Sequence, residues 1–262
     1  MEGAELLRAC DLNLVEVLRH FARSQPDGVV HEEAGFTMFG GSATWPGPFD
    51  NGVFVLDPRT EPADVLARAK RFFGGLGRAY CVWTGDHLDP ALEEAAREAG
   101  LVLLSEGTPQ MVLGRRLPDA VATPGVTLRT VDDDRTRRDY ITVLQRSFTP
   151  SQGTPPEVLE GNFRDLDTVH GPHTRAVVAY VGDVPAAGAF VLVSHGVASV
   201  QYVGTVEAAR GRGLGELVTR WVGNAGFDLG AQVAALQASD MGEPVYRRMG
   251  YETVTYYRYY MG

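Results

Sequence analysis

The chain has 262 residues, 44% hydrophobic and 22% charged, a composition typical of a soluble globular protein with one large or two ordinary domains. Its formal net charge of −9 argues against a nucleic acid as partner, because binding to a phosphate backbone rests on concentrated Lys and Arg. Cys10 and Cys81 stand in no CxxC or Cys/His cluster, so we expect reduced, buried thiols and no metal site. No stretch approaches the ~20 apolar residues that span a bilayer, and the N-terminus does not read as a secretory signal, which favours a cytoplasmic protein without a membrane partner.

The first half of the chain predicts helices alternating with short strands. Apolar residues recur at helical spacing from Glu2 to Ser24, and the Gly/Pro-rich run GGSATWPGPFDNG reads as a loop. The other predicted elements are strands at 29–31, 36–39 and 52–56, a helix at 62–73, a strand at 79–83, a helix at 90–99, and strands near 101–104 and 111–113.

A boundary is predicted at the segment GRRLPDAVATPG, which has two prolines and no apolar period. It separates a domain at 1–117 from a domain at 124–262, with 118–123 as a linker. The second domain is predicted to contain a strand at 126–131, helices at 134–146 and around 157–166, strands at 176–181, 186–193 and 198–206, a helix from about 215 to 229, a strand at 233–237, a helix at 244–249 and a strand at 253–260. Both halves share this order of elements, which indicates an internal duplication with Gly100 aligned to Gly250.

The most informative segment is Arg210-Gly-Arg-Gly-Leu-Gly215, between a predicted strand and a predicted helix. Glycines there allow a tight turn and a close backbone approach, and the helix N-terminus adds partial positive charge, so the segment predicts a phosphate-binding loop. It does not match the dinucleotide fingerprint G-x-G-x-x-G, and the chain has no G-x-x-x-x-G-K-[ST] motif. Both of those nucleotide-binding alternatives are therefore less favoured.

This loop resembles the acetyl-CoA signature [QR]-x-x-G-x-[GA] of the GCN5-related N-acetyltransferases (GNAT), with Arg210, Gly213 and Gly215 at its three defining positions. The resemblance implies that backbone N–H groups of the loop bind the CoA pyrophosphate and that the preceding strand runs beside the pantetheine arm. The positions it assigns to the cofactor are Val203, Thr205, Val206, Arg210, Gly211, Arg212, Gly213, Leu214, Gly215 and Ser239.

The resemblance continues into LQASDMGEPVYRRMGYETV, similar to the closing strand–helix–strand of the family. It places Tyr246 beside the thioester sulfur, where a phenol could protonate the departing thiolate. The alternative for Tyr246 is an aromatic side chain packed against the sheet. Two departures stand out: Glu207 replaces a frequent proline, and the run 198–206 has no carboxylate to serve as a general base.

The N-terminal half lacks the corresponding chemistry. It has no glycine between Leu56 and Phe73, and Ala96 aligns with Tyr246. We therefore expect an α/β (α+β) fold of tandem acetyltransferase-like domains, each a mixed, mainly antiparallel sheet flanked by helices, with a degenerate first domain.

The resemblance implies direct acetyl transfer from acetyl-CoA, a co-substrate, to a primary amine of a small molecule or peptide, without a metal. The alternatives are a non-catalytic acyl-CoA sensor and, less favoured, a scaffolding protein. The sequence identifies neither the acceptor nor whether copies form a homo-oligomer.

Overall fold

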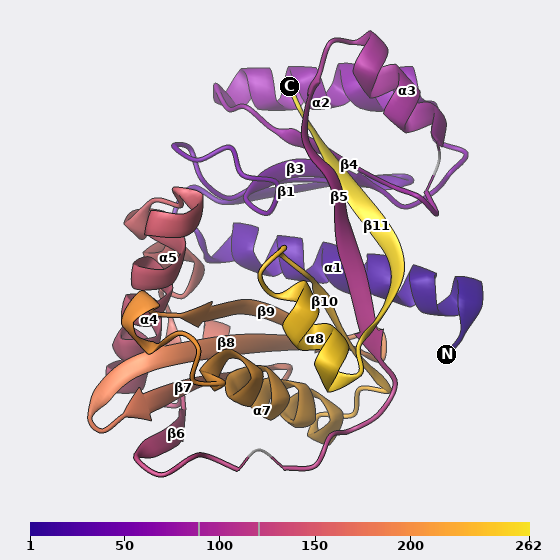
Figure 1. Ribbon diagram of the computed structural model, residues 1–262. Helices are drawn as coiled ribbons and strands as arrows, with labels where there is room; N and C mark the ends of the chain where they lie inside the picture. The colour runs from indigo at the N-terminus through magenta and orange to yellow at the C-terminus, as the bar shows by residue number, and fades with distance from the viewer. Residues whose placement is uncertain (89, 120) are drawn as a thin grey trace. The chain divides into compact units, whose positions relative to one another are not determined.

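The computed structural model describes residues 1–88, 90–119 and 121–262, and its contacts divide the chain into two compact units (Figure 1). The N-terminal unit comprises Glu2–Gln110 and Thr253–Gly262, and the C-terminal unit comprises Met1 and Met111–Glu252. Within the described residues, no helix is both long enough and apolar enough to cross a membrane.

The N-terminal unit is a mixed sheet with three helices. Its helices are α1 (Gly3–Ser24), α2 (Pro62–Leu76) and α3 (Pro90–Glu98). Its strands, in spatial order, are β1 (Val29–Glu33), β2 (Phe36–Gly40), β3 (Asn51–Val55), β4 (Cys81–Gly85) and the greater part of β11 (Glu252–Met261) and of β5 (Val102–Leu113). The pairs β1–β2, β2–β3 and β4–β11 are antiparallel, whereas β3 and β4 are parallel and are joined through α2.

Two apolar clusters cover the two faces of this sheet. On β3, Val53 and Val55 belong to the cluster that includes α2 and α3, while Phe54 belongs to the cluster that includes α1. This alternation follows the two-residue period of a strand. Cys10 and Cys81 are free and buried, as predicted, and burial raises the pKa of each thiol to about 12.

The C-terminal strand β11 completes the N-terminal sheet. It pairs with β4 in the register Tyr257↔Gly85 to Met261↔Cys81, and it lies between β4 and β5 (Figure 1, yellow). The predicted domain 124–262 assigned this strand to the C-terminal half. The pattern predicted the strand but not its partner, because pairing depends on residues about 170 positions away in the chain. Likewise, the two strands predicted near 101–104 and 111–113 form the single strand β5.

The C-terminal unit has a five-stranded sheet in the order β10, β9, β8, β7, β6. Its strands are β6 (Val126–Thr130), β7 (Thr174–Val181), β8 (Val184–Ser194), β9 (Val197–Thr205) and β10 (Val233–Gln237). Its helices are α4 (Asp134–Gln152), α5 (Pro156–Asn162), α6 (Leu166–Val169), the 3₁₀ turn η1 (Glu207–Ala209), α7 (Leu214–Asp228) and α8 (Glu243–Met249). β9 and β10 are parallel and are joined through α7, while β6 to β9 form an antiparallel meander.

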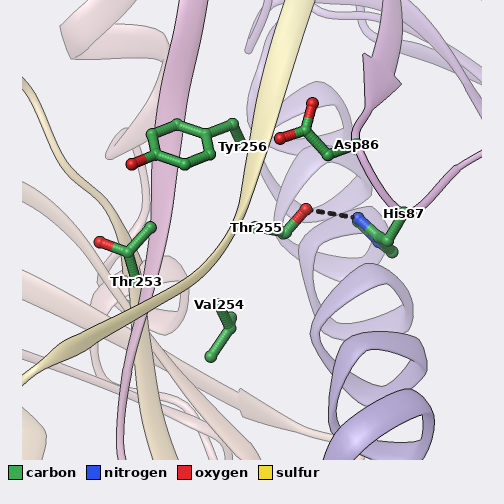
Figure 2. A pocket seen from close by; sticks show the side chains of 6 residues that line it. All are labelled: Asp86, His87, Thr253, Val254, Thr255 and Tyr256. Atoms are coloured by element: carbon green, nitrogen blue, oxygen red, sulfur yellow. Dashed lines mark hydrogen bonds between the residues drawn. The ribbon is translucent and has the colours of Figure 1, made fainter.

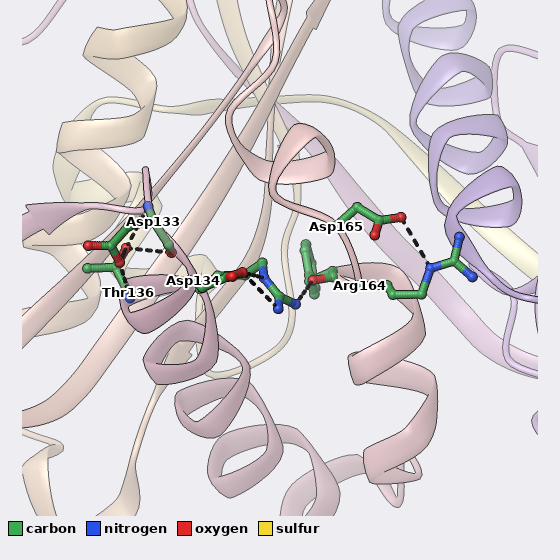
Figure 3. A network of polar contacts seen from close by, with 7 residues as sticks. Asp133, Asp134, Thr136, Arg164 and Asp165 are labelled. Atoms are coloured by element: carbon green, nitrogen blue, oxygen red, sulfur yellow. Dashed lines mark hydrogen bonds and ion pairs between the residues drawn. The ribbon is translucent and has the colours of Figure 1, made fainter.

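Helix α4 begins at a capping box and extends further than the sequence predicted. Asp133 Oδ1 accepts from the Thr136 amide at 2.7 Å, and Thr136 Oγ1 accepts from the Asp133 amide at 3.3 Å (Figure 3). The predicted end at Arg146 was too early, because the helix continues through Pro150 to Gln152. Ser151 Oγ donates to the Ser147 carbonyl at 2.6 Å, within the last turn of this helix.

A β-bulge in β9 reverses which residues face each side of the sheet. Gly188 of β8 lies opposite Gly204 and Phe190 lies opposite Gln201, so two residues of β9 stand against one of β8. Tyr202, inside the bulge, has a φ of 50°. Before the bulge Ala198 packs against α7, and after it Gly204 packs against α4. The bulge therefore sets the orientation of the last residues of β9.

Candidate functional site

The C-terminal unit contains a pocket of about 420 Å³ where β9 ends and α7 begins. Its walls come from the end of α4, the last residues of β9, the glycine loop, the first turn of α7, and the β10–α8 segment. The predicted site residues that line it are Val203, Thr205, Arg210, Gly211, Gly213, Leu214, Gly215, Ser239 and Tyr246. The structure thus brings together residues from a strand, a loop and two helices.

The glycine loop adopts a backbone that side chains other than glycine rarely accept. Gly211 and Gly213 each have a φ of 74°, in the left-handed region. A Cβ built on either residue would meet no protein atom within 4 Å, so the space beside the loop is open. Gly215 has an ordinary φ, and a Cβ there would lie 3.5 Å from Thr205 Oγ1. The first two glycines are therefore required by the turn itself.

The N-terminus of α7 points its amide groups at this pocket without a side-chain cap. Gly213 is the N-cap residue, and no side chain accepts from the first-turn amides. These orphan amides and the helix dipole favour an anion at this position. Arg210 and Arg248, both exposed and lining the pocket, add two positive charges. The carboxylate of Glu216 is paired with Arg220 at 2.7 Å. The arrangement suits a phosphate-bearing ligand.

The last residues of β9 line the pocket, beyond the point where the described pairing of β9 with β10 ends. Their described register ends at Ala235↔Ser199. Beyond it, Gln201 Nε2 donates to Gln237 Oε1 at 2.7 Å and to Ser199 Oγ at 2.9 Å, so side chains bridge the strands where the ladder stops. Gln201 is buried, and β9 carries no carboxylate. The Gln201–Gln237 hydrogen bond thus links the two strands beyond this register.

Tyr246 lies on α8 and lines the same pocket. Burial raises the pKa of its phenol to about 12, and the nearby Thr219 hydroxyl lowers it by less. Its ring stands 5.9 Å from the Tyr251 ring, with an angle of 60° between the ring planes. Tyr246 is therefore protonated at neutral pH and is placed at the wall of the cavity.

Two predicted cofactor-binding residues do not line this pocket. Val206 is buried, and its amide donates to the Ala186 carbonyl at 2.9 Å. Arg212 is exposed between the two left-handed glycines. Ser239 does line the pocket, and its Oγ accepts from the Gly242 amide at 3.3 Å, which supports the turn before α8.

Several pocket residues were not anticipated from the sequence. Four come from the last turns of α4, and the others lie near α8: Ser147, Phe148, Ser151, Gln152, Met241, Gly242, Val245 and Arg248. The α4 residues were missed because the prediction ended that helix at Arg146. Arg248 stands two residues after Tyr246 in the sequence, so the position predicted for Tyr246 could have indicated that Arg248 also lies near the pocket.

Comparisons with known proteins bear on the fold and on residues 113–238. Residues 113–238 match the acetyltransferase (GNAT) domain family. No curated protein sequence matched the chain. A GCN5-related N-acetyltransferase from Kribbella flavida superposes with a TM-score of 0.73 at 20% identity, covering 97% of this chain and 94% of that one. A tandem GNAT protein from the clavulanic acid biosynthesis pathway gives a TM-score of 0.64 at 14% identity, covering 91% and 84%. A functionally unknown conserved protein from Staphylococcus epidermidis gives 0.65 at 16% identity, covering 90% and 94%.

These structural similarities lie below 25% identity, so they establish the fold. The predicted mixed α/β fold of acetyltransferase type is confirmed, and the similarity extends over most of the chain. Residues 113–238, which hold the glycine loop and most of its pocket, match the model of the acetyltransferase (GNAT) domain.

Proposed function

We propose that the C-terminal unit is an acetyl-CoA-dependent N-acetyltransferase that acts on a primary amine. The carrying observation is that one pocket holds both an uncapped helix N-terminus with two left-handed glycines and a protonated tyrosine. The loop amides, Arg210 and Arg248 would hold the pyrophosphate, and the edge of β9 at Val203–Thr205 would lie beside the pantetheine arm.

The thioester of acetyl-CoA supplies an activated acetyl carbonyl. In the proposed reaction the neutral amine attacks that carbonyl, the carbon–sulfur bond breaks, and an amide forms. Tyr246 gives its phenolic proton to the departing sulfur. The amine loses its extra proton to water, because β9 offers no carboxylate. The main contribution of the protein would be positioning of the two substrates in a ternary complex.

A non-catalytic acyl-CoA sensor is the second candidate. The glycine loop suits either function, whereas Tyr246 matters only to an enzyme. Thiol release from acetyl-CoA, measured with amines, aminoglycosides, amino acids and peptides and checked by product mass, separates the two. Binding of acetyl-CoA without thiol release for any acceptor would favour the sensor.

Calorimetric titration with acetyl-CoA tests where the cofactor binds. We expect one site per chain, because the N-terminal unit has no glycine between Leu56 and Phe73. Two equivalent sites would contradict the proposal that the N-terminal unit lacks CoA chemistry.

A further inference from the structure

The N-terminal unit contains a cavity of about 780 Å³, larger than the glycine-loop pocket. Its walls come from one face of α1, from the end of β3 with the loop that follows, from His87 and Leu88 after β4, and from the first turn of α3. Apolar side chains, including Leu7, Leu56, Leu88 and Leu92, form much of its surface. A cavity of this size and character is typical of small-molecule sites.

This cavity and the glycine-loop pocket occupy equivalent places in the two sheets. Each lies at the end of the strand that leads into a crossover helix, β3 into α2 and β9 into α7. The cavity is unsuited to a diphosphate, however. Its loop has no glycine, and Pro62 at the start of α2 removes one of the N–H groups that would face an anion. A different ligand chemistry is required.

The rim of the cavity is electrically balanced by an internal ion pair. Arg59 donates from Nη2 to Asp57 Oδ2 at 2.7 Å and from Nε to Asp57 Oδ1 at 3.0 Å. Both residues line the cavity, and the Arg59 side chain is largely exposed. This pair therefore contributes little net charge to the interior, and α1 supplies the charges that would select a ligand.

Arg8 and Asp11 lie one turn apart on α1, and both line the cavity. Residues at this spacing have Cβ atoms about 5–6 Å apart. Arg8 Nη1 donates to the Leu56 carbonyl at 2.6 Å, which holds the guanidinium at the loop and leaves its other N–H donors for a ligand. A cationic group and an anionic group thus stand side by side next to an apolar wall.

The carboxylate of Asp11 is buried and held by two neighbouring side chains. Tyr257 donates its hydroxyl to Oδ1 at 2.6 Å, and His87 Nε2 lies 3.0 and 3.1 Å from the two carboxylate oxygens. His87 is itself fixed, because its Nδ1 lies 2.8 Å from Thr255 Oγ1 (Figure 2). A carboxylate has about four acceptor positions, so these donors leave room for a further one.

We propose that this cavity binds an α-amino acid with an apolar side chain. Its carboxylate would meet Arg8, its ammonium group would donate to Asp11, and its side chain would lie against the leucines. In an α-amino acid the ammonium nitrogen and the carboxylate carbon are bonded to the same carbon, so the two charges lie close together. That spacing suits two side chains that project from adjacent turns of one helix. Because Asp11 is already held in place, ligand binding would not have to offset the conformational entropy of ordering its side chain.

The proposal is tested by calorimetry on the full chain with L-leucine and L-phenylalanine. N-acetyl-L-leucine, which has no ammonium group, and L-leucinamide, which has no carboxylate, are the comparison ligands. We expect the amino acids to bind and each comparison ligand to bind at least about tenfold more weakly. N-acetyl-L-leucine leaves the buried Asp11 carboxylate without the ammonium donor, and L-leucinamide lacks the charge-assisted hydrogen bond to Arg8. Equal binding of all three ligands, or no binding of either amino acid at millimolar concentration, would overturn the proposal.

Variants then locate the site. Arg8→Gln and Asp11→Asn should weaken leucine binding at least about tenfold. Arg23→Gln, on the same helix and exposed, is the matched control and should not change it. If Asp11→Asn does not fold, Arg8→Gln still decides the question, because its side chain is exposed. Unchanged binding in Arg8→Gln, or displacement of leucine by acetyl-CoA, would show that the amino acid binds elsewhere or that the cavity takes the cofactor.

Discussion

Tyr246 illustrates how one hydroxyl can be tested apart from its ring. Burial raises the pKa of the phenol to about 12, so the hydroxyl carries its proton at neutral pH. Tyr246→Phe removes this hydroxyl and almost no volume. We expect turnover of a good acceptor at saturating acetyl-CoA to fall by about ten- to ten-thousand-fold, within the range of general acid catalysis. Acetyl-CoA affinity should change far less, because the hydroxyl acts as charge develops on sulfur.

The matched control is Tyr251→Phe. This phenol lies in the same neighbourhood, 5.9 Å from Tyr246 between ring centroids, and burial also raises its pKa. It does not line the pocket. If Tyr246→Phe left turnover intact, or if both variants lowered it equally, Tyr246 would be a packing residue and water the proton source.

At single positions, the sequence predicted the residues of the loop better than those around it. Gly211, Gly213 and Gly215 form a contiguous motif whose chemistry depends on local backbone geometry, and they line one pocket. Ser147 and Phe148 face the same pocket from α4, more than 60 residues earlier. No local pattern marks such residues, because only the packing of α4 on the sheet brings them to the site.

Among the elements, the turn into α7 allows a test of phosphate binding with matched backbone strain. Gly213 begins the helix with a φ of 74°, and Gly230 follows its end with a φ of 98°. A Cβ at either position meets no protein atom within 4 Å. Gly213→Val and Gly230→Val should therefore each lose roughly 1–2 kcal/mol of unfolding free energy from the left-handed backbone. Only Gly213→Val should abolish acetyl-CoA binding in calorimetric titration; a folded variant with unchanged affinity would refute the loop assignment.

Strand β11 gives a second test at this scale. Tyr257 is fully buried and donates to Asp11 at 2.6 Å, within the N-terminal unit. Tyr257→Phe leaves a buried carboxylate without one donor, and we expect a loss of about 1.5–3 kcal/mol in urea unfolding. Hydrogen exchange should also quicken in β4, to which β11 is paired.

The control for this prediction is Tyr256→Phe, one residue earlier on the same strand and partly exposed. It should leave both stability and exchange unchanged. An equal effect of the two substitutions would mean that the Tyr257–Asp11 bond does not tie β11 to its unit. The sequence predicted a strand at 253–260, but the partner that gives this strand its role lies in the first half of the sequence.

For the molecule as a whole, the two sheets repeat one pairing pattern with different chemistry. Strands β1–β4 and β7–β10 each form an antiparallel meander followed by a parallel crossover. The shared order of elements made this repeat predictable. The divergence of its two cavities was predictable only in part: the lack of glycine after Leu56 is visible in the sequence, whereas the meeting of Asp11, His87 and Tyr257 requires the fold.

The stability of the whole chain should depend on pH through Asp50. This carboxyl is buried in the loop between β2 and β3, and burial raises its pKa from 3.8 to about 7. The folded state therefore keeps a proton that the unfolded chain loses above pH 4. Its stabilising contribution is fully present below pH 3.8, is lost as pH rises towards 7, and is constant above that. Three pKa units correspond to roughly 4 kcal/mol.

Asp50→Asn removes this titration while keeping a similar shape. Because other carboxyls titrate in both proteins, the informative quantity is the difference in unfolding free energy between variant and wild type, measured in urea at several pH values from 4 to 8. We expect the difference to move in favour of the variant as pH rises to about 7 and then to level off. Asp27→Asn, at an exposed position between α1 and β1, is the control for the chemical change from Asp to Asn. A flat difference for Asp50→Asn would mean that the Asp50 carboxyl ionises normally in the folded chain.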